Sequence, residues 1–126
     1  MRDAVEKVYE LHKKNQIYSA WAQDETIIDM IKDLQSEVEE VREEAEREDW
    51  DNFKDEIGDV LWDCLGIIVR AENEGHFTMK EVLEHIHQKF TERKPFLLES
   101  RHISKEEENK LWREVKEKQK NARNRS

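Results

Sequence analysis

Two pairs of carboxylates are the residues of this sequence whose types and spacing best suit a chemical role. Glu37 and Glu40 form the first pair, and Glu56 and Asp59 form the second. A separation of three residues is nearly one turn of an α-helix, so both members of a pair project from the same side of a helix. Carboxylate oxygens on neighbouring helices are the ligands that Mg²⁺ and Mn²⁺ prefer.

The apolar pattern predicts the two helices that carry these pairs. Its stripes are Ile27, Ile31, Leu34, Val38, Val41 and Ala45 on the first helix, and Phe53, Ile57, Val60, Leu61, Cys64 and Ile68 on the second. On each helix the carboxylates lie about 80° and about 140° from the centre of the stripe, at about 100° per residue, in the same rotational sense. A hairpin that turns near Glu48 therefore places Glu37 beside Asp59 and Glu40 beside Glu56. Four carboxylates so placed repel one another unless a cation lies between them.

A solvated acidic face is the alternative interpretation of the same residues. The chain is 42% charged, so acidic pairs at helical spacing arise easily. The mirrored spacing and the matched angles favour the metal site, but geometry alone leaves both interpretations open.

The same residues also carry a family resemblance. Glu37 and Glu40, followed by Glu56 and Asp59 within DEIGDVLW, resemble the MazG-like nucleoside triphosphate pyrophosphohydrolases, all-α enzymes whose signature is EExxE and then ExxD on consecutive helices. Upstream, WAQDET at 21–26 is similar to the family's entry to the first metal helix. Downstream, KFTERKPF at 89–96 is similar to its basic tail. The resemblance covers roughly residues 21–98 in the family's order.

This resemblance implies Mg²⁺-dependent hydrolysis of a nucleoside triphosphate to the monophosphate and pyrophosphate, with Mn²⁺ as a possible substitute. The implied metal ligands are Glu37, Glu40, Glu56 and Asp59, and Glu40 is the first choice for the acceptor of the water's proton. Trp21 would bound the base pocket, and Lys89 and Arg93 would contact phosphate. The resemblance further implies a homodimer or homotetramer in which a neighbouring chain completes the pocket.

Three positions bear on the finer detail of such a site. Ser36 stands where the family has the first Glu of EExxE, which leaves the four ligands in place but changes their surroundings. Asp63 lies one turn beyond Asp59 and is a candidate to orient a metal-bound water. His87 replaces an Asn that the family often carries, which leaves the substrate open.

Composition predicts an all-α chain, since only one Pro and three Gly occur and the Val and Ile residues follow helical spacing. We expect a four-helix core bundle over 1–100, an additional C-terminal helix over 101–118 that packs on the bundle or on a neighbouring subunit, and a basic disordered tail over 119–126. The expected helices are 2–15, 24–47, 51–74, 79–93 and 104–118, with a loop over 15–23. Asp24 and Asp51 are expected N-caps, and Thr78 with Glu81 and Ser104 with Glu107 form expected capping boxes.

Charge and apolar runs limit the partners. The net charge is −9, and residues 24–59 hold 16 acidic and 4 basic side chains, which disfavours nucleic acid as a partner. No apolar run approaches the length of a membrane span, and the single cysteine, Cys64, excludes a disulfide framework. We therefore expect a cytoplasmic protein without a membrane partner.

Two alternative functions remain open at this point. A narrower enzyme would prefer dUTP or dCTP, or would be the related phosphoribosyl-ATP pyrophosphohydrolase. A non-catalytic acidic bundle would only oligomerise or bind a protein. The base and the sugar of the substrate are not specified by the sequence.

Overall fold

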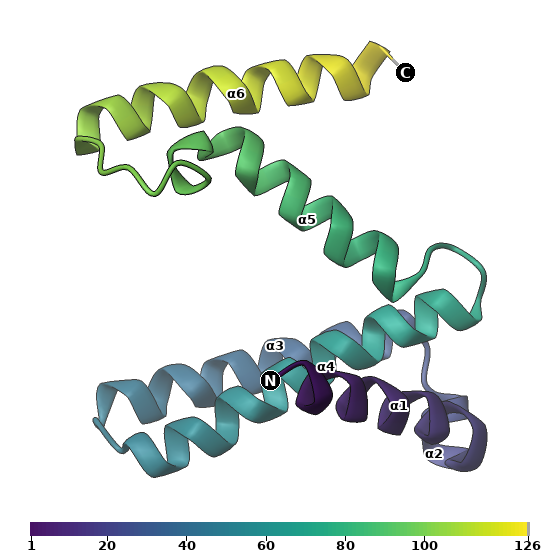
Figure 1. Cartoon of the computed structure of the whole chain (residues 1–126). Helices are drawn as coiled ribbons and strands as arrows, with labels where there is room; N and C mark the ends of the chain where they lie inside the picture. Colours follow the sequence, from purple (N-terminus) through teal and green to yellow (C-terminus); the bar gives the residue numbers. More distant parts are fainter. Residues whose placement is uncertain (126) are drawn as a thin grey trace. The chain divides into compact units, whose positions relative to one another are not determined.

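The computed structural model describes residues 1–125, which form six α-helices and one short 3₁₀ helix without a strand (Figure 1). The predicted all-α class is confirmed. The described chain divides into two compact units, Met1–Met79 and the part from Lys80 onward.

The centre of the first unit is a hairpin of two helices, α3 (Ile27–Glu46) and α4 (Trp50–Asn73), which lie side by side (Figure 1). The turn between them is centred on Glu48, whose φ of 56° is in the left-handed region. Its backbone N–H groups close the end of α3, because Glu48 donates to Ala45 and Asp49 donates to Glu44 at 3.1 and 3.2 Å. The hairpin thus turns where the mirrored spacing predicted it.

The N-caps of both hairpin helices differ from those predicted. Thr26, rather than Asp24, caps α3 through a reciprocal capping box with Asp29, with both hydrogen bonds at 3.1 Å. Asp49, rather than Asp51, caps α4 by accepting from the Asn52 N–H at 3.2 Å. Asp51 lies instead in the first turn, where a negative charge is favourable at the helix N-terminus.

The predicted loop over 15–23 is wrong, because most of it is helical. Helix α1 (Arg2–Tyr18) continues beyond residue 15, and a short helix α2 (Ala20–Asp24) follows. Ser19 separates them and caps α2, since its hydroxyl accepts from the Ala22 N–H at 3.2 Å. A polar run with one capping serine permits two helices as readily as a loop.

Helix α1 packs against α4, and two of their side-chain contacts involve His12 and Tyr9. The buried imidazole of His12 stacks on the Trp62 indole, with ring centroids 3.6 Å apart. The Tyr9 hydroxyl donates to Glu72, which also accepts the Met79 N–H at 2.7 Å. Helix α4 ends at Gly75, as predicted, in a Schellman arrangement that needs the left-handed φ of 82° found there.

The second unit contains most of α5 (Met79–Arg93), the 3₁₀ helix η1 (Pro95–Leu97) and α6 (Lys105–Arg125). The bounds of α5 match the prediction, and the Ser104 hydroxyl caps α6 by accepting the Glu107 N–H at 3.1 Å. The chain is helical to Arg125, where the sequence predicted a disordered tail after Lys118; residue 126 lies outside the described residues. Gln119 explains the extension, because it bonds to Arg93 and Glu92 of α5 at 2.8 and 2.7 Å.

The structure also bears on the expectations about membrane spans and the single cysteine. Within the described part of the chain, no helix combines the length and the apolar character that crossing a membrane requires. Cys64 is a free, half-buried thiol on α4, on the side predicted to face the core.

Candidate metal centre

The hairpin of α3 and α4 brings three of the four predicted metal ligands together. One carboxylate oxygen from each of Glu37, Glu56 and Asp59 lies within 4.8 Å of the other two. Glu37 projects from α3, and the other two project from α4 one turn apart. The antiparallel hairpin therefore creates this group from residues about twenty positions apart in the sequence.

The fourth predicted ligand, Glu40, lies beside Glu56 rather than inside this group. Burial raises the pKa of the Glu56 carboxyl group, and the negative charge of Glu40 beside it raises that pKa further. Glu40 thus lies opposite Glu56 across the hairpin, as the spacing predicted, and at the edge of the cluster.

Glu37 experiences the strongest effect of the cluster. Burial, followed by the charges of Glu40, Asp59, Asp63 and Glu56, raises the pKa of the Glu37 carboxyl to about 7. Its Oε2 atom is buried and accepts no hydrogen bond from any described residue. A buried carboxylate oxygen without a donor is costly, so this atom fits a site for a cation. Because every candidate ligand atom is a carboxylate oxygen, the group suits Mg²⁺ or Mn²⁺.

A second acidic group adjoins the cluster; its member Asp63 was singled out from the sequence, whereas Asp33 and Glu25 were not. Burial raises the pKa of Asp63, and the charges of Asp33 and Asp59 raise it further. Burial also raises the pKa of Glu25, and the negative charge of Asp33 raises it further. Asp63 therefore links the predicted ligands to Asp33 and Glu25. Asp33 precedes Glu37 by one helical turn, and this spacing is the signal in the sequence that indicates it.

A small cavity of about 70 Å³ lies beside this second acidic group. His12 forms part of its wall; the side chain is 2% exposed, and its Nε2 atom has no hydrogen-bond partner among the described residues. Burial lowers the pKa of His12, although a hydrogen bond to the Trp62 backbone opposes this, so the imidazole is neutral at pH 7. The complete lining is His12, Asn15, Gln16, Glu25, Met30, Asp33, Trp62, Asp63 and Gly66.

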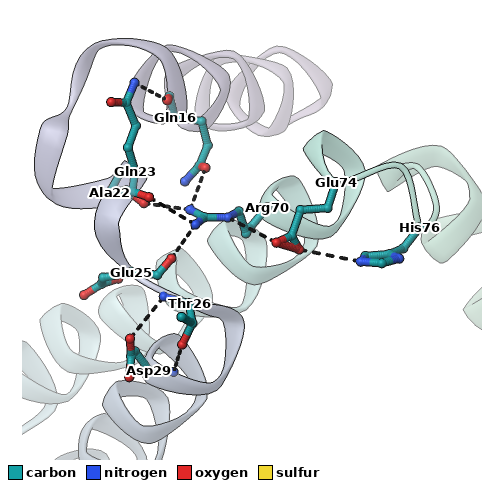
Figure 2. A network of polar contacts seen from close by, with 9 residues as sticks. All are labelled: Gln16, Ala22, Gln23, Glu25, Thr26, Asp29, Arg70, Glu74 and His76. Carbon is teal, nitrogen blue, oxygen red and sulfur yellow. Dashed lines mark hydrogen bonds and ion pairs between the residues drawn. The ribbon is translucent and has the colours of Figure 1, made fainter.

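Arg70 of α4 is hydrogen-bonded to two residues that line this cavity, Gln16 and Glu25, and Figure 2 shows its contacts. Its guanidinium donates to the Gln16 side chain at 3.1 Å, and to the backbone carbonyls of Ala22, Gln23 and Glu25, the first at 2.7 Å (Figure 2). It also pairs with Glu74 at 3.7 Å. Apart from the pair with Glu74, these bonds tie the end of α1 and the segment from α2 to the residue before the α3 cap to α4.

The remaining predicted site residues of the first unit lie near this segment or on α3. Trp21 is 78% exposed on α2 and does not line the cavity, but its indole N–H donates to the Glu25 carboxylate at 3.2 Å. Ser36 is exposed, and its hydroxyl donates to the Lys32 carbonyl of its own helix at 3.5 Å. The structure thus places Trp21 at the edge of the acidic region and uses the Ser36 hydroxyl locally.

Lys89, Arg93 and His87 belong to the second unit. Lys89 and Arg93 lie one turn apart on α5, and His87 is exposed on the same helix. Arg93 is buried; its Nε donates to Gln119 at 2.8 Å, and its guanidinium lies 4.8 Å from the centre of the Trp112 ring. Their contact with phosphate stays a prediction.

Comparison with known proteins agrees with this arrangement. A family model described as the MazG nucleotide pyrophosphohydrolase domain matches residues 25–98, a range that includes all four carboxylates together with Lys89 and Arg93. The crystal structure of a mazG-related protein from Thermotoga maritima is 29% identical in sequence and superposes with a TM-score of 0.84. The match covers 89% of this chain and 98% of that one.

A relative in Bacillus subtilis (strain 168) is the uncharacterized protein YabN, 29% identical over 105 residues. The match covers 81% of this chain but 21% of YabN, so this chain spans about a fifth of that relative's length. The family match extends over more than half of the present sequence and includes the hairpin with its carboxylates. The chain therefore belongs to the MazG nucleotide pyrophosphohydrolase domain family.

Proposed function

We propose that this protein hydrolyses nucleoside triphosphates to the monophosphate and pyrophosphate in the presence of Mg²⁺, as part of the maintenance of cytoplasmic nucleotide pools. Membership of the family supports a pyrophosphohydrolase in general terms. The observation that carries the proposal is the buried, unpartnered Oε2 of Glu37 within a group of three convergent carboxylates.

Glu37, Glu56 and Asp59 would hold the cation, with Glu40 at the edge of the group. A divalent ion at this position supplies positive charge against the triphosphate and makes a nearby water more acidic. The role of the protein is to keep the three carboxylates close together despite their repulsion, which the packed hairpin does through its backbone. Mn²⁺ is the expected substitute for Mg²⁺ because both prefer oxygen ligands.

Glu40 is the carboxylate that we assign to take a proton from the attacking water. It lies outside the three-residue group and its side chain is exposed, so its oxygens can face water without being withdrawn from the cation. Its charge raises the pKa of both Glu37 and Glu56, so it lies close to the cluster. A general base must lie within hydrogen-bonding reach of the water, directly or through one intervening water.

Contacts to the remainder of the substrate are assigned to three regions. Trp21 presents an exposed aromatic face for a base or a ribose. The cavity of His12 and Trp62 offers a neutral imidazole beside the acidic residues. Lys89 and Arg93 would stabilise charge on the leaving pyrophosphate. We further propose a homodimer or homotetramer in which a neighbouring chain completes the pocket.

The test is a panel of canonical and deoxy nucleoside triphosphates incubated with Mg²⁺ or Mn²⁺, with the products identified by mass. We expect monophosphate and pyrophosphate as products. Glu56→Gln and Asp59→Asn should each reduce turnover by about 100-fold or more, since each removes a metal ligand. Glu43→Gln, which neutralises an exposed carboxylate on α3 outside the cluster, is the matched control and should retain full activity.

The same panel separates the alternatives. Turnover confined to dUTP or dCTP, or to phosphoribosyl-ATP, would identify the narrower enzyme. A non-catalytic bundle predicts no turnover and no calorimetric signal with Mn²⁺. Turnover that is unchanged in both Glu56→Gln and Asp59→Asn would contradict the assignment of these residues.

A further inference from the structure

Arg70 of α4 holds a segment of the chain that is distant in sequence, residues 16–25, which include the end of α1 and all of α2 (Figure 2). We call these residues the α2 segment. The Arg70 side chain is 14% exposed. Its two terminal nitrogens donate to four acceptors, which are the Gln16 side chain and the carbonyls of Ala22, Gln23 and Glu25. One guanidinium therefore satisfies polar groups along the whole α2 segment.

The short helix α2 (Ala20–Asp24) needs a partner of this kind. It has five residues, and a helix of this length is not stable without contacts to the rest of a protein. The carbonyls at its end have no acceptor role within the helix, and Arg70 donates to two of them, those of Ala22 and Gln23, at 2.7 and 3.2 Å. The guanidinium also brings positive charge to the negative end of the helix.

The backbones of α2 and α4 do not provide this link. Among the residues that the structure describes, no Cα atom of α2 lies within 8 Å of a Cα atom of α4. The long Arg70 side chain spans the distance instead, and its planar fork of donors suits several acceptors at once. The position of the α2 segment on α4 therefore depends on the geometry of the guanidinium as well as on its charge.

The α2 segment carries Trp21 and Glu25, which lie one helical turn apart. The Trp21 indole N–H donates to the Glu25 carboxylate at 3.2 Å, while Arg70 bonds the Glu25 backbone carbonyl. Gln16 and Glu25 also line the cavity beside the acidic residues. Trp21 itself is 78% exposed, so few other contacts hold its ring. The bonds of Arg70 therefore fix the backbone from which both side chains project.

We propose that Arg70 is a positioning residue for the nucleoside part of the substrate, because it holds Trp21 and Glu25 in place at the edge of the acidic region. Arg70 belongs neither to the group of convergent carboxylates nor to the lining of the cavity, so it acts through the α2 segment. Trp21 enters the proposed function as the contact to a base or a ribose, so the inference rests on that assignment and deepens it.

Steady-state kinetics of Arg70→Lys and Arg70→Met, with dATP, dCTP, dGTP and dTTP in the presence of Mg²⁺, tests this role. Lysine keeps the charge but lacks the fork, and methionine keeps much of the length without a donor. Each variant should raise KM by about tenfold or more and keep kcat within about threefold, since only substrate positioning is lost. A purely structural defect would instead lower the fraction of folded enzyme, and so kcat, while KM stays unchanged.

Glu74→Gln is the matched control. It removes the ion pair that Glu74 forms with Arg70 at 3.7 Å, but leaves every hydrogen bond from Arg70 to the α2 segment in place. KM should stay within about twofold of the original value, because an exposed ion pair contributes little. An increase in KM as large as that of Arg70→Lys would overturn the inference.

A double variant tests whether Arg70 acts through Trp21. Trp21→Leu should raise KM by itself, and adding Arg70→Lys to it should raise KM by less than about twofold more, because coupled residues do not have additive effects. Fully additive effects of the two changes would show that Arg70 acts by another route, which would overturn the inference.

Amide hydrogen exchange provides a readout that does not require activity. Arg70→Lys should speed exchange at the Ala22 and Gln23 N–H groups, which are bonded to Ser19, by about tenfold or more, while the amides of α3 keep their original rates. Unchanged exchange at Ala22 and Gln23 would overturn the inference.

Binding of the α,β-methylene analogues of the same four nucleotides, measured by calorimetry with Mg²⁺, separates this inference from the proposed function. If the original protein releases no pyrophosphate but binds an analogue that Arg70→Lys binds about tenfold more weakly, the proposed function fails and the inference is supported. If the original protein hydrolyses nucleotides and both Arg70 variants keep its KM, the inference fails and the proposed function is supported.

Discussion

Both the position and the charged surroundings of Glu37 indicate a cation site. Its carboxyl group is surrounded by four other acidic side chains, and one of its oxygens is buried without a donor. At neutral pH the metal-free protein therefore holds a proton on Glu37 in a substantial fraction of molecules, because its pKa is about 7. A divalent cation must displace that proton before it can bind there.

This competition predicts a pH-dependent affinity for Mn²⁺. The pKa of Glu37 is raised, so the protonated form predominates below about pH 7, and affinity should rise by up to about tenfold per pH unit below that value and level off above it. The same raised pKa means that Glu37 favours the metal-free fold below its ordinary pKa of about 4.5, a contribution that is lost as the pH rises through about 7.

Calorimetric titration with Mn²⁺ at several pH values, in buffers of different ionisation enthalpy, measures both the affinity and the proton released. In Glu37→Gln the pH dependence around neutrality should be much reduced, and the residual affinity should be lower at every pH. An affinity of the original protein that does not change between acidic and basic pH would argue against displacement of a proton from this carboxyl group.

The carboxylates were predictable from the sequence, whereas their neighbours were not. The three-residue spacing on two helices is mirrored about Glu48, and this suffices to bring Glu37 close to Asp59. Helix geometry fixes both the position of each side chain along the helix axis and its direction around that axis. His12 and Glu25 come to the site through the packing of α1 and α2 on α4. No local spacing encodes that contact. Gly66 is the indirect signal, because a glycine inside a helix indicates the close approach of another group.

At the scale of the elements, the turn of the hairpin is under conformational strain. Glu48 adopts a φ of 56°, which a side chain with a Cβ atom disfavours. Replacement of Glu48 by Gly should therefore stabilise the protein by about 1 kcal/mol, while Glu48→Ala retains the strain. Thermal unfolding of the three proteins measures this difference, and a Gly variant no more stable than the Ala variant would contradict the assignment of strain to the turn.

Replacing the two glycines inside α4 by alanine should change the stability of the protein in opposite directions. A methyl group on Gly66 would lie 3.0 Å from His12 Cε1 and 3.4 Å from its Nδ1, whereas one on Gly58 would meet nothing within 4 Å. Gly66→Ala should destabilise the protein by about 1–3 kcal/mol through overpacking, and Gly58→Ala should stabilise the helix by up to about 1 kcal/mol.

Denaturant unfolding of both glycine variants measures the difference, and each serves as the control for the other. A stabilised Gly66→Ala protein would show that the stacking of His12 against α4 is looser than the structure indicates. Fluorescence of Trp62, which contacts His12, provides a second observation of the same packing.

The ends of the helices were predictable where a glycine or a proline stops the helix. Gly75 and Pro95 ended α4 and α5 as expected, because one supplies a left-handed φ and the other cannot continue a helix. The caps of α3 and α4 were misassigned, since several acidic or hydroxyl residues precede each helix and only the hydrogen bonds identify which one is used. The length of α6 depends on the contact of Gln119 with α5, which local propensity does not show.

At the scale of the whole molecule, the hairpin leaves much apolar surface exposed. No residue of α3 is buried within the described chain, and Ile28, Val38 and Leu61 are 62, 51 and 59% exposed. Exposed apolar side chains such as these favour association, which supports the homo-oligomer that we propose.

Val38→Lys should shift the assembly toward smaller species, because a charge would have to be buried in the interface. Gln35→Lys adds the same charge at an exposed polar position of the same helix and should leave the assembly unchanged. Size-exclusion chromatography with light scattering measures the mass of each. A monomeric original protein would contradict the proposed oligomer.

In the proposed site, the two helices of the hairpin jointly hold one divalent cation. Anomalous diffraction from crystals grown with Mn²⁺ tests this, because manganese is located independently of the protein atoms. We predict a peak about 2.0–2.3 Å from carboxylate oxygens of both α3 and α4, among Glu37, Glu56 and Asp59. A well-diffracting crystal without a peak at these residues, or with manganese bound only elsewhere, would contradict the claim.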